Sequence, residues 1–122
     1  YVESTLRRLS CLGPSKVVLT GVAFDGRQVG SASYDRSTDE ISYALSDTVD
    51  GYFHGTGDVF ASALAALLVR GAPLSAALET ATALTDESIC RSLWRDTPRR
   101  FGVDFEGALP AYIRRVEKIF EA

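Results

Sequence analysis

The sequence predicts an α/β protein, and three features support this fold class. Short β-branched and leucine runs, such as Lys16–Thr20, alternate with longer segments in which apolar residues recur at helical spacing. Turn-forming residues separate these segments, and Asp25-Gly26 is a strong turn signal. The 122 residues are 46% hydrophobic, which suits one globular domain with a buried core. We therefore expect one α/β unit over residues 1–122.

The first part of the chain is predicted to form a helix and then strands. Apolar residues at approximate helical spacing predict a helix over 2–12, which Gly13-Pro14 ends. The run Lys16–Thr20 predicts a strand buried on both faces, as in a parallel sheet. Polar and apolar residues alternate over 40–45, as in a half-exposed antiparallel strand. We expect a β-hairpin over 27–46, appended to the parallel sheet.

The second part is predicted to be mainly helical. A loop over 46–54 precedes a buried helix over 56–70, which Gly71 ends. A second helix is expected over 74–94, followed by a mixed region up to residue 109. The chain then closes on an amphipathic helix. Its apolar residues are Tyr112, Ile113, Val116, Ile119 and Phe120.

The most informative stretch is Gly55-Thr56-Gly57-Asp58, directly before the apolar run 59–69. Two glycines let the backbone turn tightly and bring its N–H groups close to a ligand. At a helix N-terminus, unpaired N–H groups and the helix dipole favour an anion. Asp58 adds a carboxylate that can take a proton from an attacking hydroxyl. The pattern indicates a phosphoryl-transfer site, whereas four residues alone also fit a structural helix start, where aspartate favours the dipole.

Three stretches resemble a known family. Residues 53–64 (Phe-His-Gly-Thr-Gly-Asp-Val-Phe-Ala-Ser-Ala-Leu) resemble the C-terminal signature of the ribokinase-like (phosphofructokinase-B-type) kinases. Within these kinases they look most like pyridoxal (pyridoxine/pyridoxamine) kinase. Lys16–Val22 and Phe101–Glu106 resemble the same subgroup at matching relative positions. The likeness covers nearly the whole chain, but only the C-terminal half of those kinases.

The resemblance implies a fold and an activity. The fold would be the C-terminal half of a ribokinase-like, Rossmann-like three-layer sandwich, with residues 1–122 as its nucleotide-binding portion and the N-terminal half absent. The activity would be ATP-dependent phosphorylation of the hydroxymethyl group of pyridoxal, pyridoxine or pyridoxamine, with Mg²⁺, to give pyridoxal 5′-phosphate. The parent enzyme would be a homodimer that binds a small alcohol and ATP.

The resemblance also implies roles for individual residues. Asp58 would be the general base, and Gly55, Thr56 and Gly57 would form the anion hole. Thr20 and Gly21, expected at the carboxyl end of the strand Lys16–Thr20, would lie near the nucleotide phosphates. Phe53 would border the adenine or the anion loop, although a core aromatic is an equal alternative. No residue is assigned as a metal ligand.

Two alternatives remain open. Another ribokinase-like kinase, acting on hydroxymethylpyrimidine or a sugar, would share the Gly-Thr-Gly-Asp motif. A non-catalytic nucleotide-binding fragment, or a subunit completed by another chain, would keep the anion hole without the reaction.

Composition excludes several other classes. A net charge of −3 argues against a nucleic-acid binder, and Arg95, Arg99 and Arg100 fit a solvated loop better than a phosphate clamp. Cys11 and Cys90 lack metal-ligand spacing, which favours a reducing, cytoplasmic setting. No apolar run reaches membrane-spanning length, and no Walker-type phosphate loop is present.

Overall fold

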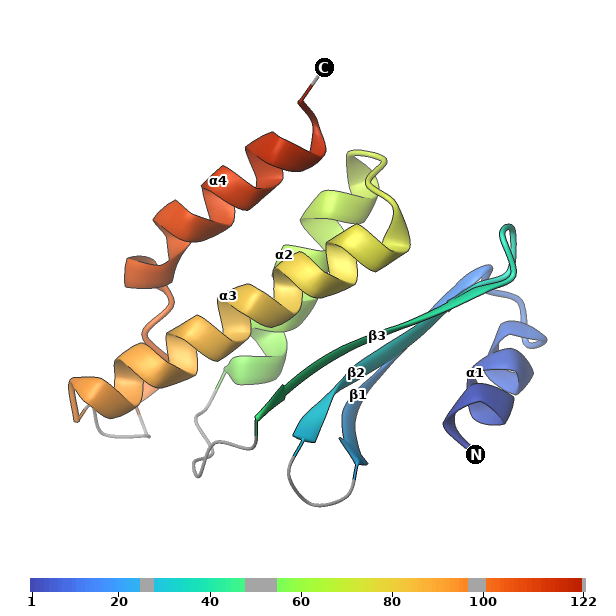
Figure 1. The fold of residues 1–122 in the computed structure, drawn as a ribbon, viewed down its shortest axis with the longest axis horizontal. Helices are drawn as coiled ribbons and strands as arrows, with labels where there is room; N and C mark the ends of the chain where they lie inside the picture. The colour runs from blue at the N-terminus through green and yellow to red at the C-terminus, as the bar shows by residue number, and fades with distance from the viewer. Residues whose placement is uncertain (25–27, 48–54, 97–100, 122) are drawn as a thin grey trace. The chain divides into compact units, whose positions relative to one another are not determined.

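The computed structural model describes residues 1–24, 28–47, 55–96 and 101–121 (Figure 1). The chain divides into two compact units, Tyr1–Thr48 and Val49–Ala122. The first contains α1 (Val2–Ser10), β1 (Lys16–Phe24), β2 (Gln28–Asp35) and β3 (Glu40–Asp47). The second contains α2 (Thr56–Val69), α3 (Leu74–Trp94), the short 3₁₀ helix η2 (Glu106–Ala108) and α4 (Leu109–Ile119). The mixed α/β class is confirmed.

The sheet of the first unit has the strand order β1-β2-β3, and both ladders are antiparallel. The predicted hairpin is therefore confirmed, with Tyr34 opposite Ile41 across β2 and β3. The parallel sheet is wrong for the part of the chain that the structure describes, because β1 pairs antiparallel with β2. Only residues 25–27 separate these strands, and a parallel crossover needs a dozen residues or more.

Thr20 and Gly21 lie inside β1 rather than at its end. The strand continues to Phe24, and its pairing with β2 shifts register between Leu19 and Val22. Gly21 has a φ of +66°, a left-handed conformation that glycine adopts readily. The predicted strand end at Thr20 is therefore wrong. These two residues form a β-bulge, a feature that can turn side chains away from the regular ladder.

Gly30 lies at a close approach between β2 and β3. A Cβ atom there would collide with the backbone of Ala44 and Leu45, which cannot move aside without breaking the ladder. We expect Gly30→Ala to lower the free energy of unfolding by about 3 kcal/mol, the upper range for overpacking. Urea unfolding measures this loss. A loss below about 0.5 kcal/mol, the usual range of surface substitutions, would contradict the close approach.

Helix α1 covers one face of this sheet. Leu6 is fully buried against Val17, Ala32 and Tyr34. Lys16 and Thr20 remain exposed, so the prediction of a strand buried on both faces is also wrong. The guanidinium of Arg36 donates hydrogen bonds to the Ser10 and Gly13 carbonyl oxygens, at 3.0 and 3.3 Å, and so ties the end of α1 to the sheet.

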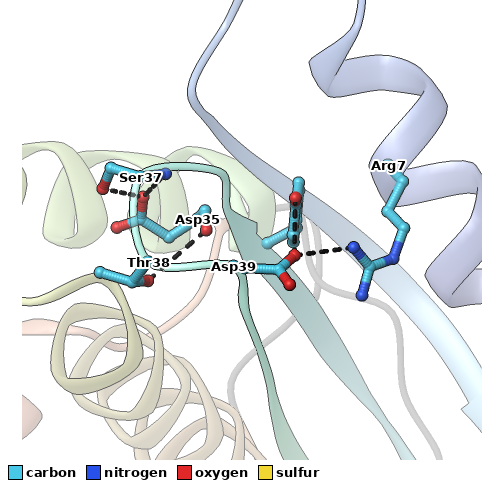
Figure 2. A network of polar contacts seen from close by, with 6 residues as sticks. Arg7, Asp35, Ser37, Thr38 and Asp39 are labelled. Atoms are coloured by element: carbon cyan, nitrogen blue, oxygen red, sulfur yellow. Dashed lines mark hydrogen bonds and ion pairs between the residues drawn. The ribbon is translucent and has the colours of Figure 1, made fainter.

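A polar network fixes the turn between β2 and β3 to α1 (Figure 2). Arg7 Nη1 donates to Asp39 Oδ1 at 2.8 Å, and the Tyr34 hydroxyl donates to the same oxygen at 3.0 Å. In the same turn, Asp35 Oδ1 accepts bonds from the Ser37 backbone N–H and hydroxyl. These contacts hold Asp39 at a φ of +55°, which aspartate tolerates better than most residues.

This network predicts a loss of stability in acid. Hydrogen bonds from Arg7 and then Tyr34 lower the pKa of Asp39. A carboxylate with a lowered folded-state pKa contributes stability above its unfolded pKa of about 4 and loses it as the pH falls through the folded value. We expect Asp39→Asn, which keeps the shape and tolerates the same φ, to lower the unfolding free energy at pH 7. That difference should shrink in acid titrations below about pH 4; an unchanged difference would contradict the ion pair's role.

The second unit is a helical assembly in which α2 and α4 both pack against α3 (Figure 1). Helix α2 ends as predicted at Gly71, whose φ is +93°. The Ala72 N–H donates to the Leu67 carbonyl and the Gly71 N–H to the Leu68 carbonyl, which is a Schellman motif. The predicted helix over 74–94 is confirmed. The predicted amphipathic C-terminal helix is also confirmed, and three of its residues together with its C-cap residue pack against a core of Leu67, Ala72 and Ala77. They are Tyr112, Val116, Ile119 and Phe120.

Candidate active site

The Gly-Thr-Gly-Asp stretch begins helix α2, as predicted. Gly55 is the N-cap residue and has a left-handed φ of 83°, while helical structure starts at Thr56. The Val59 N–H donates to the Gly55 carbonyl at 2.9 Å and closes the first turn. No side chain caps this helix start among the described residues. The first N–H groups of a helix have no partner within it, so this turn can receive an anion.

The two glycines play different parts. Gly55 makes the tight turn, because its φ is one that side-chain-bearing residues rarely adopt. Gly57 lies within the first helical turn and lacks a left-handed φ, and a Cβ atom there would meet nothing within 4 Å. The expectation that both glycines serve the tight turn is therefore wrong for Gly57.

Asp58 lies in the first turn of α2 and lines a hollow of about 480 Å³. Gly55 and Val59, from the same helix start, also line it. The other lining residues are Arg95 and the segment Phe101–Glu106. All of them belong to the second unit. The carboxylate and the helix N-terminus thus face a common space large enough for a small ligand.

A second hollow, of about 350 Å³, also reaches Asp58. Helices α2, α3 and α4 all contribute to it, and Phe105 and Val59 line both hollows. Its remaining lining residues are Ser62, Ala63, Ala66, Leu84, Leu109 and Tyr112. Asp58 therefore lies where a hollow lined by four charged residues, called the polar hollow below, meets an almost wholly apolar one, called the apolar hollow.

Tyr112 supplies a fixed polar group on the apolar side. Its hydroxyl donates to the Ala63 carbonyl of α2 at 3.0 Å. Burial raises the pKa of the Tyr112 phenol, which therefore stays protonated and keeps this bond at neutral pH. The bond joins α4 to α2 next to the apolar hollow.

Sequence reasoning missed the far side of the first hollow. Arg95 was assigned to a solvated loop, but its guanidinium lines the hollow and pairs with Asp104 at 3.1 Å. The resemblance of Phe101–Glu106 to the same kinases implies no role for its residues. The signal that could have found this side was the resemblance itself, since the segment matched the same kinases as the Gly-Thr-Gly-Asp motif.

The other predicted site residues lie in three different parts of the chain. Thr20 and Gly21 lie in the β-bulge of the first unit, so a role in nucleotide binding stays a prediction for them. Phe53 lies outside the described residues, as do Arg99 and Arg100. Thr56 and Gly57 share the first turn of α2 with Asp58.

The described residues do not form a metal site by themselves. Within the described ranges, no group of three or more histidine, cysteine, aspartate or glutamate side chains is arranged to hold an ion. They therefore do not fit a protein-only Mg²⁺ cage. Cys11 and Cys90 are free and exposed. None of the described helices is long and apolar enough to cross a lipid bilayer.

Comparison with known proteins decides the family. Residues 1–97 match the model of the phosphomethylpyrimidine kinase family. The chain belongs to the phosphomethylpyrimidine kinase family. The resemblance to ribokinase-like kinases is thereby confirmed, and the match includes both the three-stranded sheet and the Gly-Thr-Gly-Asp helix start. No curated protein matches the chain.

Solved structures share this family member's fold. A pyridoxal kinase from Lactobacillus plantarum is 27% identical, with a TM-score of 0.82 over 97% of this chain and 43% of its own. A candidate phosphomethylpyrimidine kinase from Bacteroides thetaiotaomicron is 26% identical, with a TM-score of 0.84 over 90% of this chain and 38% of its own. Pyridoxal kinase from Leishmania donovani, in complex with ADP and pyridoxamine, is 20% identical, with a TM-score of 0.69 over 93% and 39%. The chain thus spans about two fifths of these proteins.

Proposed function

We propose that this chain carries the phosphoryl-transfer half of a kinase that moves the γ-phosphoryl group of ATP to a hydroxymethyl group on a heteroaromatic ring, with pyridoxal as the favoured acceptor. One observation carries the proposal. Asp58 lies in the first turn of a helix that starts at a left-handed glycine, between a hollow with polar groups and an apolar one. The hollow with polar groups suits a phosphate, and the apolar hollow suits the ring of an aromatic alcohol.

The residues of the helix start have separate tasks. Phosphoryl transfer passes through a loose transition state, so catalysis consists mainly of positioning and charge stabilisation. The N-terminal turn of α2, from Gly55 to Gly57, stabilises negative charge on the phosphoryl oxygens with backbone N–H groups. The Asp58 carboxylate accepts the proton of the attacking hydroxyl and returns it to solvent after transfer.

The apolar hollow suits a ring better than a sugar. Its aromatic members are Phe105 and Tyr112, and only Asp58 among its lining residues carries a charge. Such a surface favours stacking with a flat ring, whereas a sugar needs several hydrogen-bonding side chains. Hydroxymethylpyrimidine is the second candidate, because the matching family model is named for phosphomethylpyrimidine. Pyridoxal is placed first because of the structural likeness to a pyridoxal kinase at 27% identity.

The reaction also needs groups beyond the described residues. Mg²⁺ would supply charge neutralisation at the nucleotide phosphates, and one or two carboxylates together with those phosphates would suffice to hold it. We propose that residues 1–122 form the C-terminal portion of a three-layer ribokinase-like domain, in which Thr20, Gly21 and Phe53 contact the nucleotide. The active protein would then also contain a portion that corresponds to the part of the related kinases that this chain does not cover.

Phosphorylation assays with two acceptors test the proposal. The chain, and any longer form of the protein that contains it, would be supplied with Mg-ATP and either pyridoxal or hydroxymethylpyrimidine. We expect product from the longer form with both acceptors and a higher kcat/KM for pyridoxal. A higher kcat/KM for hydroxymethylpyrimidine would reverse the order of the two substrates. Product from neither acceptor, with a sugar phosphorylated instead, would refute the heteroaromatic acceptor.

A further inference from the structure

Ser92 holds the far side of the polar hollow to helix α3. Its side chain is fully buried, with 0% exposure, near the end of that helix. The Ser92 hydroxyl accepts a hydrogen bond from the Asp104 backbone N–H at 2.7 Å and donates one to the Ser88 carbonyl at 2.9 Å. Even a partly buried backbone N–H is costly to leave without a partner, so this contact fixes the middle of Phe101–Glu106.

Asp104 is held through its side chain as well. Its carboxylate Oδ2 accepts a hydrogen bond from Arg95 Nη1 at 3.1 Å, and Arg95 lies less than one turn beyond Ser92. The Asp104 side chain is only 11% exposed, whereas that of Arg95 is 60% exposed. Because a carboxylate so little exposed needs a partner, the ion pair orients the whole residue.

The segment Phe101–Glu106 has little regular structure of its own to hold it in place. Gly102 has a left-handed φ of 87°, and the Phe105 N–H donates to the Val103 carbonyl in a tight turn. Val103 is buried, and the three groups just described, one backbone N–H, one hydroxyl and one ion pair, fix the backbone and the side chain of the next residue, Asp104. The segment in turn supplies six of the ten residues that line the hollow shared with Gly55 and Asp58.

We propose that Ser92 and the Arg95–Asp104 ion pair are positioning residues for phosphoryl transfer, because they set the distance between Phe101–Glu106 and the Asp58 carboxylate. The inference rests on the proposed function. Enzymes accelerate reactions with loose transition states mainly by positioning the reacting groups. A displacement of about 1 Å, caused by a residue far from those groups, can lower the rate about a hundredfold.

Two serines of α3 provide a matched comparison. Ser88 is also fully buried and donates its hydroxyl to a carbonyl one turn back, at 2.7 Å from Leu84, but it makes no bond to Phe101–Glu106. Ser92→Ala and Ser88→Ala therefore remove the same atom from the same helix at the same burial. Only the first leaves the Asp104 N–H without its acceptor.

The test compares kinetics in a form of the protein that phosphorylates pyridoxal, well below its melting temperature. We expect Ser92→Ala to lower kcat about tenfold with a KM for ATP within about twofold, because the geometry of bound groups is disturbed rather than a contact removed. Ser88→Ala should keep kcat within about twofold, although it lowers the melting temperature by about as much as Ser92→Ala does. Equal losses of kcat in the two variants would overturn the positioning role.

The ion pair is tested separately, in case Ser92→Ala does not fold. Asp104→Asn keeps the hydrogen bond from the residue 104 N–H to the Ser92 hydroxyl but weakens the contact with Arg95. Arg95→Ala removes the cation that pairs with Asp104. If the two residues act as one support, the double variant loses no more kcat than the worse single variant. Additive losses would overturn the shared role. Arg95→Lys should recover most of the kcat lost in Arg95→Ala, since a charged partner for Asp104 is restored.

Amide hydrogen exchange separates failure of this inference from failure of the proposed function. We expect the Asp104 amide to exchange about tenfold faster in Ser92→Ala than in Ser88→Ala, whether or not the protein is catalytically active. Faster exchange with an unchanged kcat would overturn only the positioning role. An unaltered protein that transfers no phosphoryl group to any alcohol would overturn the proposed function, and the positioning role with it.

Discussion

Asp58→Asn is expected to reduce phosphoryl transfer at least a hundredfold while the affinity for nucleotide stays within a few-fold. The asparagine side chain has nearly the same size and can still lie in the first turn of α2, but it cannot accept a proton at neutral pH. General-base catalysis contributes roughly 10²–10⁴ to a rate, which sets the expected loss. Initial rates of phosphorylated product and a titration with ADP measure the two quantities.

Glu106 offers the control for this substitution. It is an exposed carboxylate that lines the same polar hollow as Asp58 but does not reach the apolar one. Glu106→Gln removes the same charge from the hollow and should keep transfer within a few-fold. If both variants lose transfer equally, the hollow needs negative charge in general, and Asp58 has no special task. Near-normal turnover of Asp58→Asn would exclude it as the base.

The two glycines of the helix start should respond to alanine in different ways. Gly55→Ala places a side chain at a φ of 83°, which costs roughly 1–2 kcal/mol for a residue other than glycine. We expect it to lower both the stability of the protein and its affinity for nucleotide, by about tenfold or more for the affinity. Gly57→Ala introduces no clash within the protein, and alanine favours helix by about 1 kcal/mol.

Gly57→Ala therefore separates ligand binding from folding. We expect the protein to gain up to about 1 kcal/mol of stability while its affinity for a non-hydrolysable ATP analogue falls, because the added methyl group occupies space next to the first N–H groups of α2. Thermal unfolding and calorimetric titration give the two results. A gain in stability with unchanged affinity would show that bound phosphate does not approach Gly57, and would remove it from the anion hole.

The helices could be predicted from sequence because their signals are local. Gly71 stops α2 by adopting the left-handed conformation, and Pro73 precedes the start of α3. The helix start at Gly55–Asp58 was also predicted, since glycine, aspartate and a following apolar run are adjacent in the chain. Anion binding at that turn depends on backbone N–H groups at a helix start, and a short sequence pattern is enough to predict such a start.

The strand pairing and the far side of the hollow could not be predicted in the same way. A buried β-branched run such as the one that begins at Lys16 occurs in parallel and antiparallel sheets alike, and the three-residue gap before Gln28 was the better guide. Arg95 looked like a solvated side chain because its partner, Asp104, lies nine residues away on an irregular segment. Contacts of this kind depend on tertiary packing rather than on periodicity.

The most direct test of the central claim is to map the binding of a non-hydrolysable ATP analogue on this chain by NMR, through the backbone amide shifts on titration. We expect the largest shifts at Gly55–Val59 and at Phe101–Glu106, which both line the polar hollow. Asp58→Asn should keep this pattern, since the carboxylate serves the acceptor and not the nucleotide. Shifts confined to other parts of the chain, with Gly55–Val59 unchanged at a saturating concentration of the analogue, would contradict the claim.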